Sequence, residues 1–238
     1  MLKLLSLYSF IVFISSSISL TATAQNKKTE KFINQYLKVA VKNRGNIPGV
    51  MSRWGKDTVT YRIFGELPFM SKKDWNKFVN EVSQLTDIVF LPTDQTQSDI
   101  LIYFGTIRGF AEYTNASIPQ SVINQYNSWN TRQRSGVTGD LKFASGCTDP
   151  DKPRVIYKGV ADVKSLFLSA IGLYSTLDDE YSLLNGGQFA GTVKLSRNDK
   201  RLIKMHYHPS LKSGLDRKTL RATLRSIDNI DELAKEKL

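Results

Sequence analysis

The sequence has a single cysteine, Cys147, and only two histidines, His206 and His208. One cysteine excludes an intramolecular disulfide, so the fold depends on burial of apolar side chains. We expect Cys147 itself to be buried; an intermolecular bridge or a nucleophile are the alternatives. The two histidines, in His-Tyr-His-Pro, share a face only in an extended backbone. We therefore expect packing or surface roles for them rather than a metal site.

The sequence also lacks a run of basic residues with interleaved aromatics, which excludes the usual pattern of nucleic-acid binding. Lys and Arg outnumber Asp and Glu by 33 to 22, giving a net charge of +11, but these charges are scattered along the chain. A basic chain of this kind is suited to anionic envelope polymers, lipid head groups or acidic proteins. No cofactor motif is present, because Gly186-Gly187 lacks the strand and lysine of a phosphate loop.

The N-terminus has the pattern of a secretory signal peptide over residues 1–24. Lys3 precedes an apolar run over residues 4–20, and Ala22-Thr23-Ala24 forms a small-residue cleavage site. No later apolar run is long enough to span a bilayer. The sequence therefore predicts export to a bacterial periplasm or the medium, with a retained anchor as the alternative. Lys3 is the only charge in the signal, so the mature chain would carry +10.

Hydrophobic periodicity divides the remaining chain into three parts. Residues 25–50 contain an amphipathic helix and a linker, residues 51–214 form a compact domain, and residues 215–238 form a terminal amphipathic helix. Within the domain, Ser71 is the expected N-cap of a helix over 72–86, Asp162 of a central helix and Ser196 of the last domain helix. A long polar insertion over 105–139 carries a short helix at 121–130. Strands are predicted at residues 58–64, 88–91, 99–104, 140–144 and 154–160.

Residues 165–175 read Ser-Leu-Phe-Leu-Ser-Ala-Ile-Gly-Leu-Tyr-Ser. The spacing resembles the zinc-binding motif of metzincin proteases, His-Glu-x-x-His-x-x-Gly-x-x-His. Alignment on Gly172 places Ser165, Ser169 and Ser175 at the three histidine positions and Leu166 at the catalytic glutamate. Serine hydroxyls bind zinc poorly and leucine cannot accept a proton, so the resemblance implies a vestigial metal site. The alternative is an ordinary core helix that ends at a glycine.

The order of the flanking elements extends this resemblance. Residues 195–207 are similar to the Leu-Ser-x-x-Asp-x-x-x-Ile-x-x-Leu-Tyr segment that opens the last helix of the metzincin domain. Residues 171–173, 181–185 and 207–215 also resemble a secreted bacterial domain family of unknown function, related to metzincins. The resemblance implies an α+β, zincin-like fold. In that fold a twisted mixed sheet of about five strands packs on a backing helix and a central helix, here with extra terminal helices.

Three further features give no support to a catalytic or metal site. No methionine lies between Ser175 and Leu195 to supply the methionine turn of the family. Asp178-Asp179-Glu180 is acidic, but it lacks the alternating spacing and glycine of a calcium loop, so we expect solvated turn residues. The serines of the central helix have no visible activating base.

The sequence therefore predicts a non-catalytic domain, without metal or cofactor, that binds a peptide, a protein or an anionic envelope polymer in a former substrate cleft. In the active relatives an edge strand beside the central helix pairs with extended substrate. Strand order predicts that this edge consists of Leu141, Lys142, Phe143 and Ala144. One alternative is an envelope hydrolase that uses an unrecognised set including His206 or His208. Another is an adaptor that docks through its terminal helices.

Overall fold

The computed structural model describes residues 27–43, 48–65, 71–95, 97–125, 128–135, 140–148, 158–185, 193–228, 230 and 232. The predicted signal peptide lies outside these residues. So do residues 154–157, most of the last predicted strand, and Gly186-Gly187.

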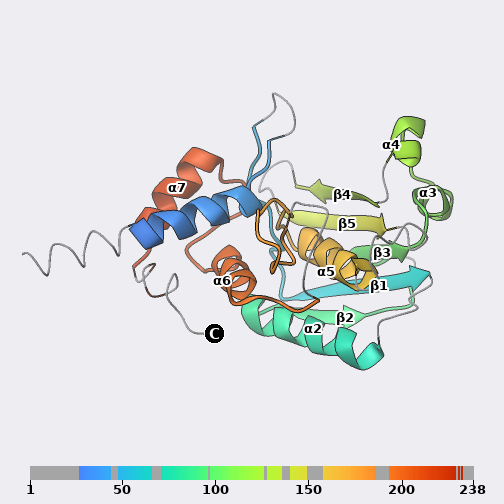
Figure 1. The fold of residues 1–238 in the computed structure, drawn as a ribbon, viewed down its shortest axis with the longest axis horizontal. Helices are drawn as coiled ribbons and strands as arrows, with labels where there is room; N and C mark the ends of the chain where they lie inside the picture. The colour runs from blue at the N-terminus through green and yellow to red at the C-terminus, as the bar shows by residue number, and fades with distance from the viewer. Residues whose placement is uncertain are drawn as a thin grey trace, which may run out of the picture.

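Five strands form one mixed sheet with the order β2-β1-β3-β5-β4 (Figure 1). Neighbouring strands are parallel except β4, which runs antiparallel to β5. The strands are β1 (Thr58–Gly65), β2 (Val89–Pro92), β3 (Ile100–Phe104), β4 (Ser128–Arg134) and β5 (Leu141–Thr148). The predicted α+β class with a mixed sheet of about five strands is confirmed.

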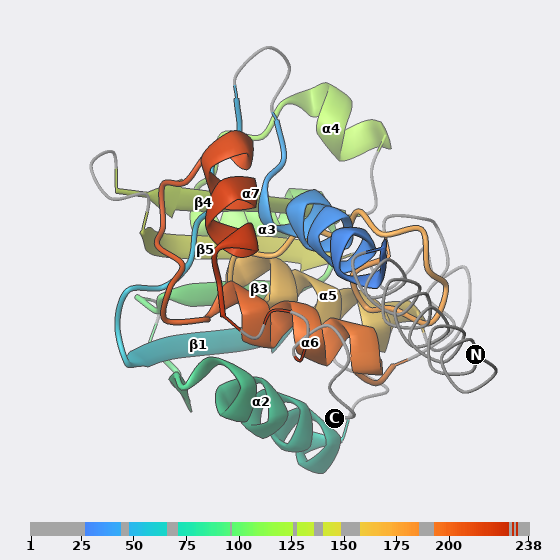
Figure 2. The same cartoon turned by 90° about the vertical axis from the view of Figure 1, so that its left-hand side faces the viewer.

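The helices flank this sheet. They are a first helix over residues 27–40, α2 (Lys72–Thr86), α3 (Ile107–Thr114), α4 (Gln120–Gln125), α5 (Lys158–Ala170), α6 (Arg197–His206) and α7 (Arg217–Arg225). Figure 2 shows α6 between α2 below it and the first helix and α7 above it. None of the helices in the described ranges combines the length and the apolar character that a bilayer crossing needs.

The central helix α5 is held against the sheet by an aromatic cluster around Phe167. The Phe167 ring meets Tyr61 of β1 at 5.7 Å, Phe90 of β2 at 5.1 Å and Trp75 of α2 at 5.4 Å between centroids, all near the edge-to-face geometry that aromatic pairs favour. Phe167 is fully buried. α2 and α5 therefore cover the same face of the sheet.

The terminal helices belong to the same hydrophobic core as α5, through fully buried residues of the first helix and of α7. The carbonyl groups at the end of the first helix find partners far along the chain. Arg217 donates to the carbonyl oxygens of Leu37 and Val41 at 3.1 and 3.2 Å, and the Tyr174 backbone N–H donates to that of Val39 at 2.7 Å. The Val39 and Val41 carbonyls lie at the helix end, where intrahelical donors run out, whereas the Leu37 carbonyl also accepts from the Val41 N–H at 3.3 Å.

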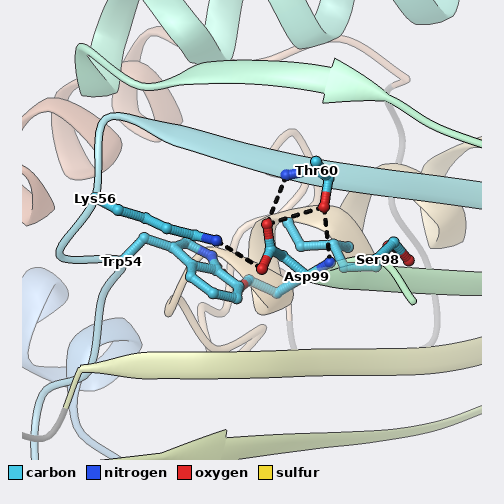
Figure 3. A network of polar contacts seen from close by, with 7 residues as sticks. Trp54, Lys56, Thr60, Ser98 and Asp99 are labelled. Atoms are coloured by element: carbon cyan, nitrogen blue, oxygen red, sulfur yellow. Dashed lines mark hydrogen bonds and ion pairs between the residues drawn. The ribbon is translucent and has the colours of Figure 1, made fainter. Parts of the chain in front are cut away.

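A polar network fixes the register of β1 against β3 (Figure 3). The Asp99 carboxylate accepts from the backbone N–H of Thr60 at 2.7 Å, from its hydroxyl at 2.9 Å and from the Lys56 ammonium at 2.6 Å. Burial raises the pKa of Asp99, but the bonds from Lys56 and Thr60 outweigh it and hold the pKa below its usual value. Nearby, Trp54 Nε1 donates to the Ala170 carbonyl at 3.0 Å and joins the segment before β1 to the end of α5.

Two predicted boundaries were wrong. Residues 158–160 of the last predicted strand form the first turn of α5, which therefore starts four residues before Asp162, the predicted cap. The short helix expected over 121–130 is α4, and Ser128 already begins β4. The sequence of β4, Ser-Trp-Asn-Thr-Arg-Gln-Arg, is mostly polar. An edge strand needs little apolar content, so hydrophobic patterning does not reveal it.

Candidate functional site

The candidate site lies at the end of α5 and in the loop that follows it. The structure brings Ser165 and Ser175 together, with their hydroxyl oxygens 2.6 Å apart in a hydrogen bond. Ser169 is one turn after Ser165 on α5, which places the two on one helix face, and it is 7% exposed. Leu166 is turned into the hydrophobic core. Hydroxyls thus meet where the resemblance places metal ligands.

The chemistry available to this group of serines is limited. The Ser165 and Ser175 hydroxyls bond to each other rather than to an imidazole or carboxylate that would activate one of them as a nucleophile. In the described parts of the chain, no three His, Cys, Asp or Glu side chains gather in a group that could hold a metal ion. The two hydroxyls form a polar pair between α5 and the loop that follows it.

Gly172 ends α5 in a way that no other residue could. Its φ is +113°, in the region that favours glycine. A Cβ atom at this position would lie 2.0 Å from the carbonyl oxygen of Ser52 and 2.5 Å from Nε2 of His206. The turn after the serine-bearing helix therefore requires glycine, because the backbone before β1 and the α6 side chain both press against it.

His206 is fully buried, and both of its ring nitrogens are engaged. Nε2 lies 3.1 Å from the Ser52 carbonyl oxygen, which can only accept, so Nε2 carries the proton. Nδ1 then accepts from the Tyr36 hydroxyl at 3.1 Å. Burial lowers the pKa of His206 to about 3, so the ring is neutral. A neutral ring that is enclosed and bonded on both sides has no free nitrogen for a metal or a substrate.

His208 lies in a different environment. It is partly exposed, and its Nδ1 accepts from the backbone N–H of Ser210 at 3.2 Å. Burial and the nearby Arg53 charge lower its pKa. The spacing of the two histidines suggested that they would not share a site, and in the structure they lie in different environments. The hydrolase alternative therefore gains no support from them.

The predicted edge strand was wrong. Leu141, Lys142, Phe143 and Ala144 lie in β5, which is paired on both sides, with β3 and with β4. The edge next to α5 is instead β4, whose Arg132 pairs with Ala144 of β5. The error arose because the polar strand β4 was not recognised in the sequence.

Arg132 and Tyr174 join this edge strand to the serine-bearing loop. The Arg132 guanidinium carbon lies 3.8 Å from the centre of the Tyr174 ring, in a cation–π contact, and Arg132 is only 8% exposed. Tyr174 directly precedes Ser175, so this contact sets the distance between β4 and the hydroxyl pair. The sequence gives no sign that Arg132 belongs to the candidate site, since it shows only that this residue lies in a polar insertion.

The acidic loop after Ser175 is organised by Asp199 of α6. The buried Asp199 carboxylate accepts from the Ser182 hydroxyl and, at 3.1 Å, from the Leu183 N–H. It also closes a capping box with Ser196, the predicted N-cap of this helix. In the loop, the Asp179 carboxylate accepts from the Tyr181 N–H at 3.0 Å, as a turn residue does.

Asp178 and Glu180 of this loop are exposed, in keeping with solvated turn residues. Cys147 is fully buried and packs with Ile107 and Phe110, as expected for a structural cysteine.

Comparison with known proteins does not assign a family to this chain: no protein-family model matches it, and a search of curated proteins finds no match.

Proposed function

We propose that this protein is a non-catalytic, zincin-like domain that binds an extended peptide along the edge strand β4. The observation that carries the proposal is the hydrogen-bonded pair of Ser165 and Ser175 beside that edge. Hydroxyl groups stand at the positions that hold zinc ligands in metzincins, while the strand that would receive a peptide is retained.

The arrangement of the elements supports the resemblance to the zincin fold. The mixed sheet carries α2 and α5 on one face, the chain turns at Gly172 just after α5, and α6 begins with a capping box of Ser196 and Asp199. The family likewise has a backing helix, an active-site helix that turns at a glycine, and a final helix that opens with Leu-Ser-x-x-Asp.

Strand β4 has the properties that peptide capture needs. It is the last strand of the sheet on this side, so one row of its backbone N–H and C=O groups has no strand partner among the described residues. α5 contacts β4, so a peptide that adds to this edge would also lie close to the serines. Asn130, Gln133 and Arg134 are exposed along the strand. The charge of the chain favours acidic peptides.

The first test concerns catalysis and metal. Protein purified from cells expressing the full chain is dialysed against Zn²⁺, analysed for bound metal and incubated with casein. We expect less than about 0.1 zinc per chain and no cleavage, because hydroxyls and a leucine replace the ligands and the base. Stoichiometric zinc together with casein cleavage would end the proposal.

The second test concerns the edge. Peptides are selected from a random dodecapeptide phage library on the wild-type protein and then measured against Asn130→Pro and Thr131→Pro. Consecutive N–H groups of a strand point in opposite directions, so one variant loses an outward donor and the other a bond to β5. We expect the outward variant to keep its melting temperature and to lose about tenfold in affinity. Equal peptide affinity for wild type and both variants would contradict binding at β4.

A further inference from the structure

A cavity of about 520 Å³ lies between α2, the first half of α5 and the segment that leads into α6. From α5 it is lined by Val160 and Lys164, which lie one turn apart on one face. Ser165 and Ser169 lie on another face of the same helix. The cavity is therefore distinct from the serine pair and the edge strand β4, and its size is within the range of small-molecule sites.

Lys164 is the unusual residue of this cavity. It is 6% exposed, although lysine is rarely buried without a charged partner. Its ammonium donates to the Val193 carbonyl oxygen at 2.6 Å and lies 5.2 Å from the centre of the Phe78 ring. Within the described ranges, the Val193 carbonyl is its only hydrogen-bond acceptor, whereas an ammonium carries three donors. The carboxylates of Asp74 and Glu81 raise the pKa of Lys164 through their charge, but burial lowers it by more, so the ammonium is incompletely compensated.

The other charged groups around the cavity leave an excess of positive charge. Four lysines and two carboxylates line it, giving a net +2; they are Asp74, Lys77, Glu81, Lys164, Lys194 and Lys200. Both carboxylates are already engaged. Glu81 pairs with Lys200 at 2.6 Å, and Asp74 accepts from the Ser71 hydroxyl at 2.6 Å at the start of α2. The cavity therefore favours an anion.

The remaining lining is apolar. Phe78 and Leu195 are 3% and 7% exposed, and Val160 and Val193 complete this part of the wall. A ligand that matches both parts of the lining has an anionic head and a compact apolar body.

We propose that this cavity binds a small organic anion, a carboxylate or a phosphate ester, with its anionic head at the Lys164 ammonium and its apolar body against Phe78 and Leu195. The head would supply a negatively charged hydrogen-bond acceptor, since the acceptor of Lys164 in the described residues is the neutral Val193 carbonyl. Charge-assisted hydrogen bonds of this kind are stronger than neutral ones. The inference is independent of peptide binding at β4.

The test is a calorimetric titration of protein purified from cells expressing the full chain. The probes are phenyl phosphate, benzoate, inorganic phosphate and benzylammonium. We expect saturable binding of the two aromatic anions, at least about tenfold weaker binding of inorganic phosphate, which lacks the apolar body, and no binding of benzylammonium. The stronger of phenyl phosphate and benzoate identifies the preferred head group.

Lys164→Met keeps the side-chain length and removes the charge, so it should weaken phenyl phosphate binding at least about tenfold. Lys72→Met is the matched control, because Lys72 is exposed and lies two residues before Asp74, on a different face of α2. If Lys164→Met fails to fold, Lys77→Gln replaces it, with a smaller expected loss of about threefold. Binding of benzylammonium as tight as that of the anions, or affinity unchanged in the folded lysine variant, would overturn the proposal.

Discussion

The hydroxyl oxygens of Ser165 and Ser175 lie 2.6 Å apart, although one belongs to α5 and the other to the loop beyond Gly172. Their meeting depends on the turn at Gly172, which carries the chain back past the helix face that also bears Ser169. Because this turn brings the three positions close together, histidines placed at all three should be able to bind one metal ion.

Replacing Ser165, Ser169 and Ser175 together with histidine should create a metal site. Two imidazoles one helical turn apart and a third across the turn supply the three ligands of an open zinc site. We expect the triple variant to bind Co²⁺ with micromolar or tighter affinity, followed by visible absorption, and the wild type not to bind it.

The matched control moves the third histidine by one residue, to Thr176, in place of Ser175. The Thr176 hydroxyl donates to the Lys38 carbonyl at 2.8 Å, so this side chain is directed to the first helix instead of Ser165. The control should bind Co²⁺ about 100-fold more weakly, because it keeps only two ligands. Equal affinities in the two triple variants would show that the three serines do not share a centre.

Gly172→Ala should destabilise the fold by about 3 kcal/mol or more, since it adds backbone strain to a collision with Ser52. Gly214→Ala is the control: Gly214 also has a positive φ, +87°, but is exposed. It should lose only about 1 kcal/mol. Urea unfolding of both variants measures the difference, and similar losses would show that the close approach at Gly172 is unimportant.

His206 should make stability depend on pH below neutrality. Its pKa is about 3 in the folded protein and about 6.5 when unfolded, so between these values only the unfolded chain takes up the proton. The free energy of unfolding therefore falls as the pH falls, by about 2 kcal/mol at pH 5. Urea unfolding at pH 7 and pH 5 should show this loss in the wild type and not in His206→Gln. His208→Gln, at a partly exposed site, should retain most of it; the same pH dependence in His206→Gln as in the wild type would refute the assignment.

Asp99→Asn should cost about 2 kcal/mol at neutral pH, because the amide cannot replace a carboxylate that accepts from Lys56 and Thr60. Asp94→Asn, at an exposed position, should change stability by less than about 0.5 kcal/mol. The pKa of Asp99 is lowered on folding, so its contribution is complete above the usual carboxyl range and is lost on acidification. The gap between wild type and Asp99→Asn should begin to narrow below about pH 4 and keep narrowing as the pH falls through the lowered pKa of Asp99. A gap that does not narrow on acidification would contradict the role of the charge.

Elements with strong apolar patterning could be predicted from the sequence. Strands β1, β2 and β3 and helix α2 lie close to their expected positions, and Ser71 and Ser196 cap the helices expected of them. These features are local, since hydrophobic periodicity and helix capping depend on residues that are close together in the sequence.

The elements that were missed depend on distant contacts. Strand β4 is polar because one side of it borders solvent, so only its pairing with β5 defines it as a strand. The role of His206 follows from Tyr36 and Ser52, which are more than 150 residues away. The excess charge around Lys164 likewise appears only when α2, α5 and the segment before α6 come together.

The pairing of Tyr36 with His206 spans 170 positions, and Arg217 closes the end of the first helix. The first helix thus packs against segments that are synthesised much later than the helix itself. A chain synthesised from its N-terminus cannot complete this hydrophobic core until those later segments have been made.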